Sequence, residues 1–240
     1  FFDTYDKTID KQIETAKHLN IKSLSIRYFG EETLKSIEDS QIKQLIHNFK
    51  KQKLSLDIVD SDYSYDIQSF DQAHWSILID HAQKLNIKTL ITHLPMIEEP
   101  LDHQMLLDHV KYLIESTKKK TFQLLFIANP SFKPGHIAYL INQIKGIKFI
   151  FDAGLIKMQK ASVTTTYRIM KKNIQGFKMY DLEKNGMPAL LGYGYTQVMD
   201  VLKKMRRDKY KGYIFIDFNL MSYLENRGTP KVKKGFFRFF

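Results

Sequence analysis

Polar side chains that could transfer protons stand at the ends of several apolar runs in this sequence. The clearest run is residues 148–156, KFIFDAGLI, in which apolar residues lead into Asp152 and Gly154 follows. A short apolar run of this kind is typical of a buried parallel strand with its carboxylate at the carboxyl end. Parallel strands of one sheet or barrel bring such ends together at a single mouth. The polar residues at the other ends are Arg27, Asp57 to Asp60, His93, Asn129, Lys178 to Asp181, and Asp217.

This set of side chains suits proton transfer beside a carbonyl group. Asp152 or Asp217 is the expected base, and Lys178 or His93 is the expected acid or electrophile. The remaining polar residues at strand ends are expected to bind the substrate: Arg27, Asp57, Asn129 and Asp181.

Helical patterns separate the apolar runs along the whole chain. The expected strands are residues 23–29, 54–59, 89–93, 122–128, 148–152, 176–180 and 212–218. The expected helices are residues 8–19, 41–51, 72–85, 101–116, 133–144, 162–171 and 197–206. Strict alternation of strand and helix predicts a parallel sheet with right-handed crossovers. The segment AKHLNIKSL, which begins at Ala16, recurs as AQKLNIKTL from Ala82, as expected of repeated βα units.

The strand spacing places one further strand just before Phe1. We therefore predict an α/β fold, a (β/α)8 TIM-type barrel that lacks or truncates its first strand. Residues 1–240 are expected to form a single domain, with a basic and aromatic tail at residues 225–240. A doubly wound open sheet is the alternative, and it ranks second because no glycine-rich phosphate loop follows an early strand.

Composition indicates an ordinary globular protein with a basic surface. Hydrophobic residues make up 43% of the chain and charged residues 26%, and there is no cysteine, which excludes disulfides and thiolate metal sites. No apolar run approaches the roughly 18 residues of a membrane helix, and no export signal is visible, so the cytoplasm is the expected compartment. The net charge of +11 comes from scattered lysines, which predicts no specific nucleic-acid partner and no membrane partner. A homodimer or a further domain upstream of Phe1 stays open.

Five motifs in the second half of the chain resemble those of a known superfamily. They are LLFIANP from Leu124, FIFDAGL from Phe149, FKMYD from Phe177, LLGYG from Leu190 and YIFID from Tyr213. Together with the strand spacing, they resemble the xylose-isomerase-like TIM barrels. That superfamily includes sugar isomerases and epimerases, inosose dehydratases and the endonuclease IV group.

The resemblance implies that these motifs hold a divalent cation and acid–base carboxylates, and part of that set is present. Asp152 keeps the carboxylate of the second metal ligand, and Asp181 is retained. Asp217 replaces the final glutamate, and His93 matches a histidine often found at that place.

Other positions depart from the superfamily pattern. Ala128 stands where the first glutamate ligand is expected, and Leu155 replaces a histidine. Lys178 stands where a ligand histidine is expected, and Tyr193 replaces the glutamate of a Gly-Glu-Gly turn.

These departures predict that no metal is bound. A hard divalent cation needs several oxygen or imidazole ligands held together. Lys178 could instead satisfy Asp152 and Asp217 by charge-assisted hydrogen bonds. We expect no cofactor; the alternative is a divalent metal, Mn, Mg or Zn, at Asp152 and Asp217.

Three functions follow from this reading. The first is a sugar or polyol isomerase/epimerase-like protein that acts on a small sugar-like ligand at the mouth and is metal-independent or catalytically degenerate. The second is a non-catalytic domain that binds a sugar-like ligand, as a sensor in a longer protein. The third is an endonuclease IV-like DNA repair nuclease, which the positive charge favours but the lost metal ligands oppose.

Overall fold

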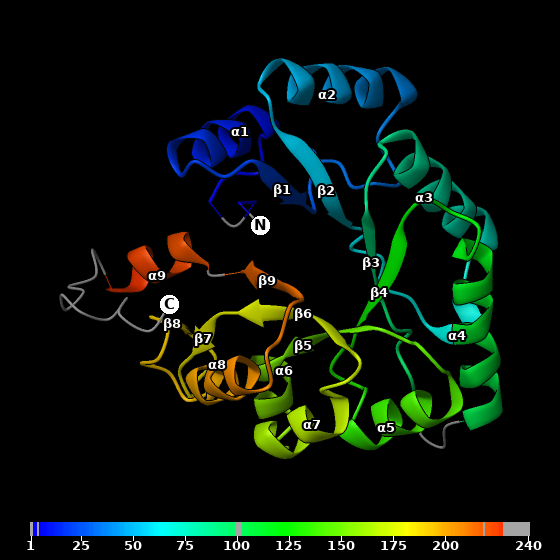
Figure 1. Cartoon of the computed structure of the whole chain (residues 1–240), viewed down its shortest axis with the longest axis vertical. Helices are drawn as coiled ribbons and strands as arrows, with labels where there is room; N and C mark the ends of the chain where they lie inside the picture. Colours follow the sequence, from blue (N-terminus) through cyan, green and yellow to red (C-terminus); the bar gives the residue numbers. More distant parts are fainter. Residues whose placement is uncertain (1, 4, 99–101, 218, 228–240) are drawn as a thin grey trace.

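A curled parallel sheet of seven strands organises the chain in its computed structural model, which describes residues 2–3, 5–98, 102–217 and 219–227. Neighbouring strands follow the order β1-β2-β3-β4-β5-β6-β9, and every pair is parallel. The strands are β1 (Ser23–Ile26), β2 (Ser55–Asp60), β3 (Thr89–His93), β4 (Gln123–Ile127), β5 (Phe149–Asp152), β6 (Ile174–Met179) and β9 (Tyr213–Ile216). Figure 1 shows the sheet as an arc with most of its helices on the outer side.

Helices alternate with these strands as the sequence pattern predicts. They are α1 (Ile9–His18), α2 (Asp39–Lys51), α3 (Gln72–Lys84), α4 (His103–Thr117), α5 (Pro134–Gln143), α6 (Ala153–Met158), α7 (Val163–Met170), α8 (Val198–Arg207) and α9 (Leu220–Arg227). Local chemistry sets some starts: Asp71 accepts hydrogen bonds from the first turn of α3, and Asp102 does the same for α4. The sequence reading did not predict α6, α9, the 3-10 turn Ile67–Ser69, or the short antiparallel hairpin β7 (Asp181–Leu182) and β8 (Pro188–Ala189).

The arc is open between its first and last strands. Among the described residues, β1 and β9 are the two edges of the sheet and do not pair with each other. A closed barrel of eight strands would have no edges. The predicted fold, a (β/α)8 barrel short of its first strand, is confirmed. The predicted tail at residues 225–240 lies outside the described residues from position 228 onwards, and the single-domain assignment stays a prediction.

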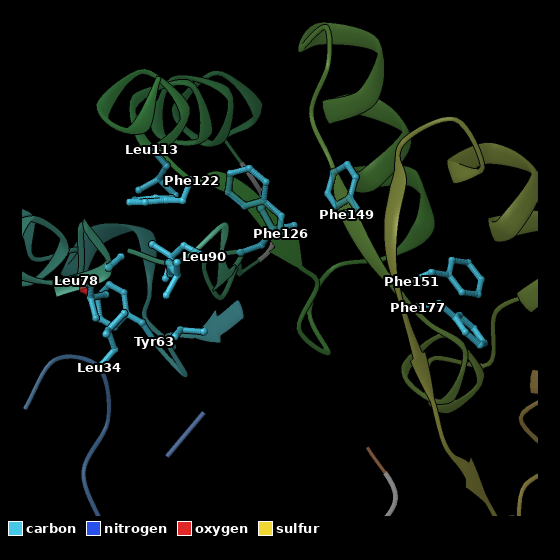
Figure 2. Packing of buried hydrophobic residues seen from close by; sticks show 14 of the residues in the cluster. Leu34, Tyr63, Leu78, Leu90, Leu113, Phe122, Phe126, Phe149, Phe151 and Phe177 are labelled. Carbon is cyan, nitrogen blue, oxygen red and sulfur yellow. The ribbon is translucent and has the colours of Figure 1, made fainter. Parts of the chain in front are cut away.

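The larger hydrophobic core lies between the sheet and its helices. Phe151 and Phe177 stack with their ring centroids 6.2 Å apart, and Phe126 packs against Phe149 at 6.3 Å (Figure 2). These rings come from adjacent strands and leave at most about one per cent of their surface exposed. Buried aromatic pairs of this kind fix the strands against the helices.

A second, smaller cluster fills the inside of the curve. It consists of Ile58, Ile91, Leu125, Ile127, Ile150 and Phe215. Gly176 on β6 completes this layer, because a Cβ there would lie 2.7 Å from the Phe215 ring and 2.8 Å from Ile150. The inner layer is therefore packed, and it forms the floor beneath the carboxyl ends of the strands.

In none of the described helices are length and apolar character combined to the degree that crossing a membrane demands.

We expect Gly176→Ala to lower the free energy of unfolding by about 1–3 kcal/mol, because the new methyl group overpacks the inner layer. Urea denaturation would measure the loss. Gly135→Ala is the matched control: a Cβ at that position in α5 meets no atom within 4 Å, and alanine favours the helix by up to about 1 kcal/mol. Equal stability of the Gly176 variant and the wild type would contradict the packing described for Phe215.

Candidate active site at the mouth of the open barrel

The alternation of side chains along the strands lifts one set of polar groups above the inner layer. A residue two positions after an inward-facing one faces the same side of the sheet. Ile58, Ile91, Ile150, Gly176 and Phe215 each belong to the inner layer. The residues two positions further on are Asp60, His93, Asp152, Lys178 and Asp217. The strands therefore deliver three carboxylates, an ammonium group and an imidazole to one mouth.

Asp217 is the centre of the charged cluster. Arg27 Nη2 donates to its Oδ1 at 2.8 Å, and Lys178 Nζ lies 2.9 Å from its Oδ2. The side chain of Asp217 is only 10% exposed. Burial by itself would raise the pKa of Asp217, but the charges of Lys178 and Arg27 lower it to about 2. Both oxygens of this carboxylate are thus held by cations.

Arg27 joins the two edges of the open sheet. It follows β1, whereas Asp217 follows β9, and the two residues are 190 positions apart in the chain. Arg27 Nε also lies 3.2 Å from Oδ2 of Asp3, whose side chain is 5% exposed. Burial raises the pKa of Asp3, although Arg27 partly offsets the shift. The amino-terminal segment therefore adds a second carboxylate to the ion pairs around Arg27 and Asp217.

Lys178 stands among the surviving acids, as the sequence predicts. Its Cα is the register partner of Asp152 on the neighbouring strand. Burial would lower the pKa of Lys178, but the charges of Asp152, Asp217 and Asp60 raise it above the ordinary value. The side chain is 13% exposed, so this is a buried and protonated ammonium group at the mouth.

Tyr180 holds Asp152 from the side. Its hydroxyl donates to Asp152 Oδ1 at 2.5 Å, and the backbone N–H of Leu155 donates to the same oxygen at 2.9 Å. Burial, together with the charge of Asp152, raises the pKa of Tyr180, so the phenol stays protonated. Gly154 makes room for this contact, because a Cβ there would overlap the tyrosine hydroxyl. No hydrogen bond from the described part of the chain occupies Asp152 Oδ2.

His93 lies on the same floor, next to Asp60. Its Nε2 is 3.8 Å from Asp60 Oδ1, and Asp60 is almost fully buried. Burial lowers the pKa of His93, and Lys178 adds to the effect, while Asp60 opposes it. The imidazole is therefore neutral near pH 7 and can accept a proton.

Three residues that the sequence analysis assigned to substrate binding are engaged elsewhere. Asp57 faces the opposite, amino-terminal end of the sheet, where it bonds Ser23 Oγ at 2.6 Å and Lys88 Nζ at 3.0 Å. This assignment is corrected, because Asp57 lies three residues before the end of β2, level with Ser23 and Lys88 at the starts of the neighbouring strands. Asp60, not Asp57, is the acid that β2 brings to the mouth.

Asn129 and Asp181 tie loops together. The amide of Asn129 donates to the carbonyl oxygens of Leu94 and Pro95, which links the loops after β3 and β4. The carboxylate of Asp181 accepts from the backbone N–H groups of Leu182, Gly192, Gly194 and Thr196 and from the Thr196 hydroxyl. Neither Asn129 nor Asp181 lies in the charged cluster, because the side chain of each is hydrogen-bonded to groups of the loops.

Asp60, Tyr180 and Asp3 were not among the site residues predicted from the sequence. The period of two along a strand places Asp60 on the same face as Ile58. In β6 the same period places Lys178 on the face opposite to Phe177. Tyr180 follows the end of a strand, and Asp3 precedes the first helix, so no local period places either of them.

The residues at the mouth do not fit a divalent metal. Both oxygens of Asp217 are paired with cations, and Asp152 Oδ1 already accepts two hydrogen bonds. Ala128 offers no ligand, and the buried side chain of Leu155 is apolar. Within the described ranges there is no group of three or more His, Cys, Asp and Glu side chains that could hold a metal ion.

Neither the protein-family models nor the curated proteins give a match to this sequence. Solved structures do match. A D-tagatose 3-epimerase-like protein gives a TM-score of 0.68 at 15% identity, with 93% of each chain covered. The IolI protein with a bound zinc atom gives 0.70 at 10% identity, covering 92% of this chain and 88% of that one. The probable 3-DHS dehydratase AsbF from Bacillus anthracis gives 0.67 at 12% identity, covering 92% and 94%.

At such low identity these likenesses establish the fold alone, because one fold can carry many different chemistries. The resemblance that the sequence motifs indicate is confirmed at this level. The chain has the fold of the xylose-isomerase-like TIM barrels, in an open form with seven strands among the described residues.

Proposed function

We propose that this protein is a metal-independent isomerase or epimerase of a small sugar or polyol, and that proton transfer beside a carbonyl group takes place at the mouth. The observation that carries the proposal is the buried ammonium of Lys178, 2.9 Å from Asp217 and in register with Asp152. An ammonium group fixed beside a carboxylate can polarise a carbonyl oxygen while a carboxylate, acting as the base, removes the neighbouring proton.

Asp152 is the proposed base. Its Oδ2 is not used by a hydrogen bond from any described residue, whereas its Oδ1 is fixed by Tyr180 and Leu155. A carboxylate held on one oxygen keeps its orientation while the other oxygen accepts the substrate proton. Asp217 could serve only by releasing a cation, because Arg27 and Lys178 occupy both its oxygens. We therefore assign it the role of holding Lys178 in place.

Lys178 is the proposed electrophile. Its charge would stabilise the negative oxygen that forms when the adjacent carbon loses a proton. His93, neutral through burial, is the proposed second proton-transfer group, contributed by β3 while Asp152 comes from β5. Epimerisation requires removal of a proton from one face and its return to the other, so two groups on different strands suit that reaction better than one.

Solved proteins with this fold support the substrate class by analogy. Their descriptions include a D-tagatose 3-epimerase-like protein and 3-keto-D-glucoside 4-epimerase YcjR from E. coli. The IolI structure carries zinc, and a protein from Thermus thermophilus was soaked with zinc chloride. The metal-independent route proposed for this chain rests on its own residues, in which a lysine and an arginine neutralise Asp217.

A non-catalytic domain that binds a sugar-like ligand is the second candidate. The observation that favours it is the mutual satisfaction of Arg27, Asp217 and Lys178, which leaves only part of the cluster open to a ligand.

Incubation with aldoses and ketoses in D2O distinguishes these candidates. Deuterium incorporation at the carbon beside the carbonyl, followed by 1H NMR, is expected and should be unaffected by EDTA. Ligand binding without exchange would favour the second candidate. Exchange that EDTA abolishes and Mn, Mg or Zn restores would overturn the metal-independent mechanism.

Tyr180→Phe is expected to slow this exchange by about 10²-fold, because Asp152 loses the hydroxyl that orients it. Tyr139→Phe is the control, since that hydroxyl only reaches a backbone oxygen of His103 at 3.4 Å on the outside of the fold. Equal rates in the two variants would remove Tyr180 and Asp152 from the mechanism.

Lys178→Met is expected to lower the free energy of unfolding at pH 7 by about 3 kcal/mol, the lower end for breaking a buried ion pair, since Arg27 still faces Asp217. In the wild type the pKa of Asp217 lies below its ordinary value, so its contribution is present above about pH 4 and is lost as the pH falls towards 2. Without Lys178 the pKa of Asp217 rises, because burial then outweighs the remaining charge. Part of the lost stability should return on acidification, as a carboxyl takes up a proton.

Urea denaturation at several pH values measures this effect. Lys203→Met is the matched control, since Lys203 pairs with Asp200 at 3.8 Å on an exposed helix face and should contribute under about 0.5 kcal/mol. A Lys178→Met variant whose stability equals that of the wild type at pH 7 would contradict the proposed role of the ammonium group.

A further inference from the structure

A groove with three lysines lies on the same end of the sheet as the mouth. It has a volume of about 680 Å³ and is formed by the end of α6 and by the turn of the β7–β8 hairpin. Its basic residues are Lys157, Lys160 and Lys184, and its other lining residues include Tyr195 and Gly186. Because α6 begins directly after Asp152 and the hairpin directly follows β6, both walls start at the charged cluster.

The walls of this groove are anchored to the loops at the mouth. Gln159, at the end of α6, donates to the backbone oxygens of Pro130 and Phe132 in the loop after β4. On the other side, Tyr195 donates its backbone N–H to the Leu182 oxygen. The Asp181 carboxylate holds the surrounding loop. Hydrogen bonds within the fold therefore hold both walls of the groove in place.

The charge of the groove is not neutralised within the described structure. None of its three lysines forms an ion pair with a described residue, and the lining contains no carboxylate. Many other lysines of this chain do pair: Lys7, Lys11, Lys84, Lys88, Lys118, Lys171 and Lys203 each lie within 4.0 Å of a carboxylate. Lys157 Nζ lies 5.8 Å from the centre of the Tyr195 ring, an aromatic contact that leaves its charge available.

We infer that this groove binds the phosphate group of a small ligand. Three ammonium groups without counter-ions attract an oxyanion, and lysine is a common phosphate ligand. Lys157 follows Asp152 by five residues, about 7.5 Å along a helix, so one small molecule can reach from the groove to the mouth. The inference rests on the proposed function in this respect: the ligand would be a phosphorylated sugar or polyol.

Titration with inorganic phosphate, a hexose 6-phosphate and the unphosphorylated hexose tests this inference. Calorimetry or NMR would give the dissociation constants at low and physiological salt. The two phosphate-bearing probes should bind. The triple variant Lys157→Gln/Lys160→Gln/Lys184→Gln should weaken that binding by about tenfold or more, equivalent to ~1.4 kcal/mol. All three lysines are at the surface, so the variant is expected to fold, which its melting temperature would verify.

A second triple variant provides the control for net charge. Lys11→Gln/Lys118→Gln/Lys203→Gln removes the same charge from lysines that pair with Glu14, Glu115 and Asp200. Equal loss of phosphate binding in both triple variants would show only a general charge effect and overturn the inference. The inference is also overturned if the groove variant binds phosphate as tightly as the wild type. It is likewise overturned if the groove variant loses binding to duplex DNA at physiological salt but keeps its binding to phosphate.

The two proposals fail in different ways. Absence of isotope exchange with every sugar would refute the proposed function but would leave the phosphate titration informative. If isotope exchange is observed but the groove variant binds phosphate as tightly as the wild type, only the inference about the groove is refuted.

Discussion

The buried carboxylate of Asp217, held between Arg27 and Lys178, is the interaction on which the mouth depends. It joins the end of β9 to the end of β1, across the side of the sheet where the described strands do not pair. A carboxylate this deeply buried would be costly without partners. Two cations at 2.8 and 2.9 Å keep it charged. One set of contacts thus links the two edges of the sheet and positions the ammonium group proposed for catalysis.

The inner layer imposes the second constraint. The Phe215 ring occupies the space beside Gly176, where a Cβ would clash with it. Lys178 lies two residues after Gly176 on the same face of the sheet, so its side chain lies at the mouth. Asp152 rises in the same way above Ile150. The apolar floor also excludes water from below, which strengthens the electrostatic interactions above it. Packing and chemistry are therefore coupled through strand parity.

The rim is organised by polar residues that do not face a ligand. Asp181 accepts hydrogen bonds from one donor in β7 and from four donors in the loop that follows β8, and Asn129 connects the loops after β3 and β4. Because these side chains are used internally, the walls of the lysine groove and the mouth keep a fixed relation. The retained aspartate of the superfamily motif thus has an architectural role in this structure.

The sequence by itself determined the alternation of strands and helices, the parallel order of the sheet and the place of Asp152, Lys178 and Asp217 at strand ends. These features follow from local periods of two and 3.6 residues, which a single sequence displays. Only the tertiary structure decided that Tyr180 fixes Asp152 and that Asp3 joins Arg27. It also decided that Asn129 and Asp181 are consumed by loops. The reason is physical: a polar side chain bonds whichever donors and acceptors the folded chain brings near it. Partners as distant as Arg27 and Asp217 become neighbours only when the sheet has curled.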